Sequence, residues 1–152
     1  MKFIKKILVL LTAAAVGMAL VACNRGDSNV SPEQNGVALA LNDGTTYSNE
    51  LGAVKVTWNN NSDQEILIDS DFEVQKQNGK DWVNFEPKEK TNTADEGISV
   101  KAGESYIMTY DLSSYDFTES GEYRLNVKYS QMTDADGGHY NGYTAWARFT
   151  VE

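Results

Sequence analysis

Five carboxylate side chains within eleven residues form the group in this chain most suited to binding a metal ion: Asp63, Glu65, Asp69, Asp71 and Glu73. No basic residue interrupts them. Calcium prefers several oxygen ligands, so a calcium site is one interpretation. However, Asp69, Asp71 and Glu73 would share one face of a strand, and an acidic face in water needs no metal. We favour the solvated face, and the sequence predicts no metal site.

Residues 132–142 hold the single histidine of the chain, His139, in a loop rich in Asp and Gly. Asp134 and Asp136 resemble the start of a calcium-binding loop, but no glutamate follows at its twelfth position, which argues against an EF-hand. One histidine cannot form a two-histidine zinc site, and no strand–GxSxG–helix segment supports a Ser-His-Asp triad. We expect a solvated His139 in a loop longer than most hairpin connections, no enzymatic activity and no cofactor.

Aromatic side chains are the remaining candidates for ligand binding. Tyr140, Tyr143 and Trp146 follow the loop, and Trp82 follows a turn. Aromatic rings can stack on sugars or on the side chains of a partner, and they are enriched in binding hot spots. Tyr143 and Trp146 are an odd number of residues apart, so on a regular strand they point to opposite faces. We expect Tyr143 in the core and Trp146 at an edge. The candidate binding residues are therefore Trp146, Tyr140, His139 and Trp82.

The single cysteine, Cys23, follows a segment with the features of an export signal. Three lysines among the first six residues precede an uncharged, mostly apolar run over 7–22, which is shorter than the ~20 residues of a membrane-spanning helix. The run ends in Leu-Val-Ala-Cys, which resembles the lipobox of bacterial lipoproteins. This resemblance implies cleavage between Ala22 and Cys23 and a diacylglyceryl group on the sulfur of Cys23. Acyl chains on Cys23 would hold the protein to the bacterial cell membrane, on its extracytoplasmic side.

Charge and composition divide the rest of the chain. Removal of residues 1–22 as a signal peptide leaves ten basic and 22 acidic side chains, a net charge of −12. This balance argues against a nucleic-acid partner, which needs clustered Lys and Arg, and against adhesion of the protein surface to anionic lipid. Residues 23–36 are polar, and we expect the lipidated cysteine and a flexible tether there. Residues 37–152 suffice for one domain with a core.

From Val37 onward the apolar residues recur at every second position, which places them on one face of β-strands. The sets are Val54, Val56 and Trp58; Tyr106, Met108, Tyr110 and Leu112; Tyr123, Leu125, Val127 and Tyr129; and Tyr143, Ala145, Ala147, Phe149 and Val151. Strands are expected near 37–41, 53–60, 64–68, 71–77, 80–86, 97–100, 104–111, 121–130 and 143–151. The sequence thus predicts an all-β fold of seven to nine strands, as a two-sheet antiparallel sandwich. A small barrel is the alternative.

The segment Gln77-Asn78-Gly79-Lys80 predicts a tight hairpin. Asn-Gly accepts positive φ at both central positions of a type I′ turn. In that register Val74 faces Val83, Phe72 faces Phe85 and Lys76 faces Asp81 on the core side, while Gln75 faces Trp82 and Glu73 faces Asn84 on the other. Trp82 would then lie on the outer face. A longer loop would change the register.

Six short segments, in order, resemble the bacterial immunoglobulin-like domains found in many Gram-positive lipoproteins. They are Val56–Ser62, Asp71–Lys76, Gly79–Trp82, Lys101–Ser105, Tyr110–Leu112 and Ser120–Arg124. The similarity covers roughly 53–130, with a final strand ending at Val151. It implies an immunoglobulin-like sandwich and no catalytic residues. Tyr123 would be the corner tyrosine, at the start of a strand, whose hydroxyl binds upstream backbone in such sandwiches.

We therefore expect a non-catalytic cell-envelope lipoprotein whose immunoglobulin-like domain serves in protein interaction or structure, through a sheet face or the 132–142 loop. The alternative is a carbohydrate- or cell-wall-binding module that uses Trp146, Tyr140 and Trp82. The expected partner is an envelope protein or a glycan.

Overall fold

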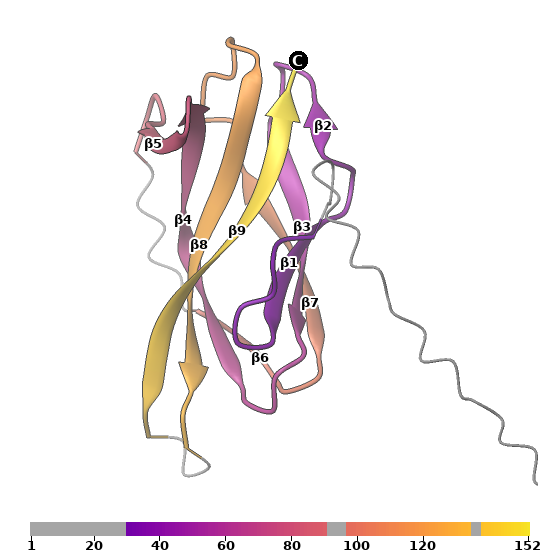
Figure 1. Cartoon of the computed structure of the whole chain (residues 1–152), viewed down its shortest axis with the longest axis vertical. Helices are drawn as coiled ribbons and strands as arrows, with labels where there is room; N and C mark the ends of the chain where they lie inside the picture. Colours follow the sequence, from indigo (N-terminus) through magenta and orange to yellow (C-terminus); the bar gives the residue numbers. More distant parts are fainter. Residues whose placement is uncertain (1–29, 91–96, 135–137) are drawn as a thin grey trace, which may run out of the picture.

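The structure is a computed structural model that describes residues 30–90, 97–134 and 138–152, which form strands, turns and loops (Figure 1). The predicted signal peptide and Cys23 lie outside the described residues. The strands are β1 (Val37–Leu41), β2 (Thr46–Tyr47), β3 (Ala53–Asn60), β4 (Ile66–Asn78), β5 (Asp81–Phe85), β6 (Ile98–Val100), β7 (Ser105–Asp111), β8 (Gly121–Met132) and β9 (Tyr140–Val151). The described part of the chain contains no helix long and apolar enough to cross a membrane.

The strands form two sheets. The smaller sheet has the order β1-β3-β7, and the larger has the order β2-β9-β8-β4-β5, with β6 also paired to β4. The pairs are antiparallel except for β2 with β9, which is parallel. Figure 1 shows the sheets as two layers, and the β8–β9 hairpin extends past the other strands at one end. The all-β, immunoglobulin-like sandwich predicted from the sequence is confirmed.

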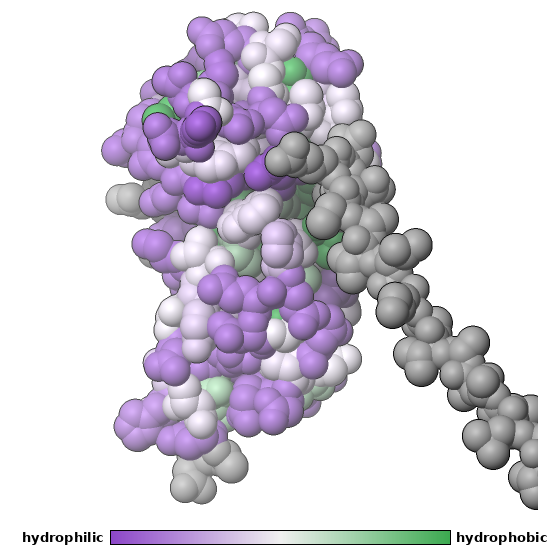
Figure 2. All heavy atoms as spheres, viewed as in Figure 1, coloured by the Kyte–Doolittle hydropathy of each residue, from purple (hydrophilic) through white to green (hydrophobic). Residues whose placement is uncertain are grey.

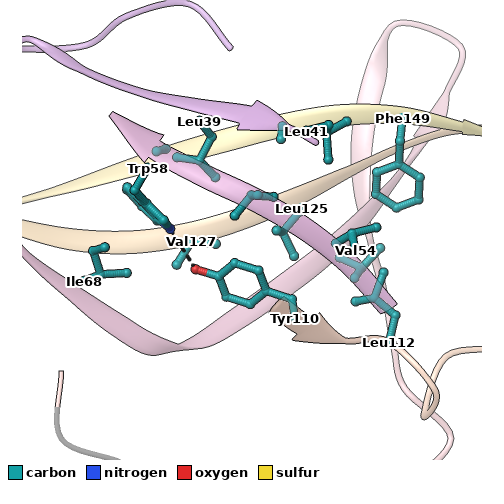
Figure 3. Close-up of a cluster of buried hydrophobic side chains, with 14 of the residues drawn as sticks. Leu39, Leu41, Val54, Trp58, Ile68, Tyr110, Leu112, Leu125, Val127 and Phe149 are labelled. Carbon is teal, nitrogen blue, oxygen red and sulfur yellow. Dashed lines mark hydrogen bonds between the residues drawn. The ribbon is translucent and has the colours of Figure 1, made fainter. Parts of the chain in front are cut away.

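The core lies between the sheets and consists of the alternating apolar sets. Residues of β3 and β8 such as Val54, Leu125 and Val127 are buried (Figure 3). The outer surface in the view of Figure 2 is mostly hydrophilic, with only small apolar patches. The alternation fails at one member of the β7 set, because Tyr106 lies near the beginning of that strand and keeps 40% of its surface exposed.

Trp58 links the two sheets in the middle of the core. Its indole N–H donates a 3.1 Å hydrogen bond to the hydroxyl of Tyr110 (Figure 3). Its ring makes an edge-to-face contact with Tyr129 of β8, at 5.8 Å between centroids. Antibody domains join their second and sixth strands across the sheets with a disulfide. With one cysteine in the chain, no such bridge can form within it, and the Trp58–Tyr129 contact is among those that join β3 to β8.

The β4–β5 hairpin has a different register from the predicted one. Asn78 pairs with Asp81, so the two-residue turn is Gly79-Lys80. Only Gly79 of these two has positive φ (+64°), which fits a type II′ turn with glycine first rather than type I′. The pairs shift by two residues, so that Val74 faces Phe85. Val83, expected in the core, is consequently 44% exposed.

A shift of two residues leaves every side chain on the face where the sequence placed it, because the strand period is two. Trp82 therefore still lies on the outer face. The same period of two explains why the inward face is kept along β4, which is one strand where two were expected at 64–68 and 71–77. Its pairing with β8 is irregular between Ile68 and Phe72, and the two extra residues keep the inward side chains inward.

Two parts of the fold were not expected. The short strand β2 pairs with the last strand, and no alternation of apolar residues predicted it. Residues 30–36, expected in the tether, contact the domain: Val30 forms a bridge with Ala40, and the N–H of Ser31 donates to the carbonyl of Leu39 at 2.7 Å. The folded body thus begins before the boundary expected at Val37.

Candidate interaction surface

The outer face of the larger sheet brings together two of the four candidate binding residues. Trp82 comes from β5 and Trp146 from β9, and both rings are partly exposed. Between these strands lie β4 and β8, so the two tryptophans are not neighbours in the sheet. They are joined by Arg124 of β8 and Arg148 of β9, which pair directly across the β8–β9 ladder. We name these four residues the Trp–Arg cluster.

Each guanidinium in the Trp–Arg cluster contacts both indoles. The Cζ atom of Arg124 lies 4.6 Å from the ring centroid of Trp82 and 5.8 Å from that of Trp146. For Arg148 the two distances are 5.2 and 5.5 Å. All four lie within the ~6 Å over which a cation is attracted by the ring quadrupole. The cluster therefore holds two like charges side by side through aromatic contacts.

Hydrogen bonds extend from the cluster across the sheet. The Nε of Arg124 donates to Oε1 of Gln75 at 2.7 Å, and Nε2 of Gln75 donates to Oδ1 of Asn84 at 3.1 Å. Arg148 has a carboxylate at a longer distance, since its Nε lies 4.0 Å from Oε2 of Glu122. These contacts connect β9, β8, β4 and β5, and they fix the orientation of Arg124 more strongly than that of Arg148.

The electrostatics of the cluster are unusual for so acidic a protein. Burial lowers the pKa of Arg124, and the neighbouring charge of Arg148 lowers that pKa further. Arg148 keeps 49% of its side-chain surface exposed. The carboxylate of Glu122 lies at ion-pair distance from Arg148. The arrangement can recognise a partner through planar cationic groups and aromatic edges, and it offers no nucleophile and no general base.

The other two candidates, Tyr140 and His139, lie at the far end of the β8–β9 hairpin, opposite the β5 end (Figure 1). The His139 Nδ1 lies 2.8 Å from Oδ2 of Asp134, and Tyr140 is 43% exposed. Tyr143, in contrast, packs on Tyr129 at 5.6 Å, as expected for a core side chain. The candidates therefore divide into two separate places. Part of the loop, residues 135–137, lies outside the described residues.

The two arginines were missed by the sequence reasoning. The alternation of side chains along each strand indicated that both arginines face outward. Arg148 is two residues from Trp146 and so shares its face, and Arg124 lies between the buried Tyr123 and Leu125. The sequence could thus have predicted that these Arg and Trp side chains lie on the outward faces of β8 and β9. The contact of the arginines with Trp82 could not have been predicted, because it depends on the order of the strands.

Tyr123 lies at the other side of the same strand, in the core. Its hydroxyl donates a 2.7 Å hydrogen bond to the carbonyl of Glu119, four residues upstream. Lys76 lies over the ring, with its Nζ 5.5 Å from the centroid, and forms an ion pair with Glu119. This is the geometry of a tyrosine corner, at the connection into β8.

No metal centre is assembled among the residues that the structure describes. These contain no group of three or more His, Cys, Asp or Glu side chains that could hold a metal ion. Of the acidic segment 63–73, Asp63, Asp71 and Glu73 are exposed, and the irregularity of β4 lies among them.

The fold defines the class of protein: a two-sheet immunoglobulin-like sandwich with a tyrosine corner. A family model described as a bacterial Ig-like domain matches residues 33–140, and the chain belongs to that family. The match begins before β1, and so it covers more of the chain than the resemblance that the short sequence segments indicated, over roughly 53–130. Domains of this family are generally non-catalytic interaction or structural modules. No curated protein matches the chain.

Proposed function

We propose that this protein is a membrane-anchored lipoprotein of the bacterial envelope, whose Ig-like domain binds a partner protein through the Trp–Arg cluster. Acyl chains on Cys23 form the anchor and hold the domain on the extracytoplasmic side. The observation that carries the binding proposal is the cluster itself: two tryptophans and two arginines gathered on a solvent-facing sheet. Trp and Arg are among the residues enriched in the hot spots of protein interfaces.

The alternative, a carbohydrate- or cell-wall-binding module, needs aromatic faces that are open to a sugar ring. Trp82 and Trp146 both contact guanidinium groups, and Tyr140 lies away from them. We therefore rank glycan binding second. A glycan array probed with the purified domain tests it, because an array signal that is abolished by Trp146→Ala would favour glycan over protein.

The anchor is tested by Cys23→Ser. Two or more acyl chains, at ~0.8 kcal/mol per buried CH₂, hold a protein stably to a bilayer, and serine removes the sulfur that carries them. We expect the variant to be released in soluble form, as measured by fractionation of membranes and medium. Membrane residence equal to that of the unchanged chain would contradict the proposed anchor.

The binding surface is tested by affinity capture from envelope extracts, with the mature chain immobilised through its N-terminus. Arg148→Ala removes the more exposed guanidinium of the cluster and should remove the specifically captured protein. Lys128→Ala is the matched control, because it removes an exposed cation of β8 outside the cluster. Identical capture by the Arg148→Ala and unchanged chains would contradict the proposed surface.

A further inference from the structure

Strand β7 is an open edge of the smaller sheet. It pairs with β3 on one side, and among the described residues no strand pairs with its other side. Four-stranded immunoglobulin sheets have a further strand at this position. Here the strand that precedes β7 in the chain, β6, is three residues long and pairs with β4 of the other sheet. The place beside β7 therefore has no described strand.

The backbone of β7 presents hydrogen-bonding groups to this open side. Asn60 donates its N–H to the carbonyl of Glu104, and Leu112 donates its N–H to the carbonyl of Gly52. Because residues of an antiparallel ladder alternate in direction, the even-numbered residues of β7 face β3. The N–H and C=O groups of Ile107 and Thr109 consequently point to the open side.

The side chains of β7 do not protect this edge. Native edge strands are commonly blocked by lysine, proline or a bulge, and the sequence of β7, Ser-Tyr-Ile-Met-Thr-Tyr-Asp, contains no lysine or proline. Its pairing with β3 is regular from Ser105 to Asp111. Ile107 and Tyr106 are 59% and 40% exposed. An exposed apolar edge of this kind favours the addition of a further strand.

A hollow of about 840 Å³ is lined by residues of β7, β4 and β5, by the segment that follows β7, and by outward-facing residues of β8 and β9. Aromatic rings of the core reach it, among them Phe72 and Tyr110. The ionisable side chains that line it are Asp71, Glu73, Glu86, Asp111, Lys90 and Lys128, which leaves an excess of negative charge. Lys90 lies 3.7 Å from Glu86, so part of the positive charge is already paired.

We propose that β7 is a docking edge for an extended segment of a partner protein, which adds to the sheet as a fourth strand and carries Lys or Arg side chains toward the hollow. Backbone hydrogen bonds to Ile107 and Thr109 hold the segment, and the apolar side chains that alternate with its basic residues contact Ile107 on the outer face of the sheet. The acidic rim selects basic segments over acidic ones. Strand β7 belongs to the smaller sheet, whereas the Trp–Arg cluster lies on the outer face of the larger sheet, so the two proposals are tested by different residues.

The test is a display library of random nine-residue peptides, selected on the immobilised mature chain. Enriched peptides should alternate Lys or Arg with Val, Ile or Thr. Thr109→Pro should weaken their binding at least tenfold in fluorescence anisotropy, because proline removes an outward N–H without removing a bond to β3. Glu73→Gln and Asp111→Asn should each weaken it a few-fold, and less at high salt.

Thr109→Val is the matched control, because it removes the hydroxyl of the same residue and keeps its outward N–H. The control should bind the selected peptides like the unchanged chain, and equal melting midpoints of the variants exclude unfolding as the cause. The docking edge is refuted if no peptides are enriched, if the enriched peptides are acidic, or if Thr109→Pro binds them undiminished.

Discussion

Trp58 and Trp82 are indoles of the same domain in two contrasting surroundings. Trp58 is fully buried, and its neighbours are the neutral rings of Tyr129 and Tyr110. Trp82 is partly exposed, and its ring contacts the guanidinium groups of Arg124 and Arg148. The inner indole contributes through burial and shape, and the outer one through charge. The two sides of the sandwich should therefore respond to different perturbations.

Trp58→Ala should have the largest effect on stability. Removal of a fully buried tryptophan costs about 3–5 kcal/mol, because the transfer free energy is lost and a cavity remains. The change also leaves the hydroxyl of Tyr110 without its indole donor. Urea unfolding followed by circular dichroism measures this loss. Trp146→Ala serves as the comparison on the outer face, and an equal loss in both variants would remove the distinction between the two sides.

The position of Trp58 in the core was predictable because its signal is local. Alternation within β3 decides which side chains face inward, and it needs no knowledge of the neighbouring strand. The outer face of Trp82 was also predicted, although the predicted turn was wrong. The predicted register differed from the observed one by an even number of residues. Trp82 therefore stayed on the predicted face, while its cross-strand partner changed.

The Trp–Arg cluster could not be predicted because it depends on strand order. Trp82 meets Arg124 only because β5, β4 and β8 are neighbours in the larger sheet. The same holds for β2, whose two residues have no pattern of their own and whose place is set by β9. The residue pattern within a strand indicates which face each side chain occupies, whereas contacts between strands distant in the sequence depend on the topology.

The second largest effect is expected from alkaline pH, which should lower the stability of the core. Burial raises the pKa of Tyr129 to about 12, from an ordinary value of 10.0, and it raises that of Tyr110 further. Because the folded state binds these protons more tightly than the unfolded state, their contribution to stability is complete below pH 10 and is lost as the pH rises toward 12. Melting midpoints between pH 9 and 12 should fall.

Tyr129→Phe should make this alkaline decline shallower, because it removes one of the hydroxyls whose pKa is raised by burial. Tyr140→Phe removes an exposed hydroxyl at the tip of the hairpin and should leave the slope of the decline unchanged. A decline of the same slope in the Tyr129→Phe variant would assign the pH dependence to other groups, and the proposed pH response of the inner side would then be wrong.

Tyr123→Phe tests the corner at the entry to β8. The hydroxyl donates to the carbonyl of Glu119, and a single hydrogen bond contributes about 1 kcal/mol to the free energy of unfolding. We expect a loss of that size in urea unfolding. Tyr47→Phe is the matched control, since the Tyr47 hydroxyl donates to a carbonyl at an exposed site and should contribute less. A variant as stable as the unchanged chain would show that the corner bond does not stabilise the fold.

The smallest expected effect is the coupling between Trp82 and Arg124. A double-mutant cycle with Trp82→Ala and Arg124→Ala should give a coupling energy of about 0.5–1 kcal/mol, as for one cation–π contact at a partly exposed site. Because the contact is electrostatic, we expect the coupling to decrease between low and high salt, whereas the cost of Trp58→Ala should be insensitive to salt. Additive single variants, or a coupling that grows with salt, would show that the outer indole acts through burial like the inner one.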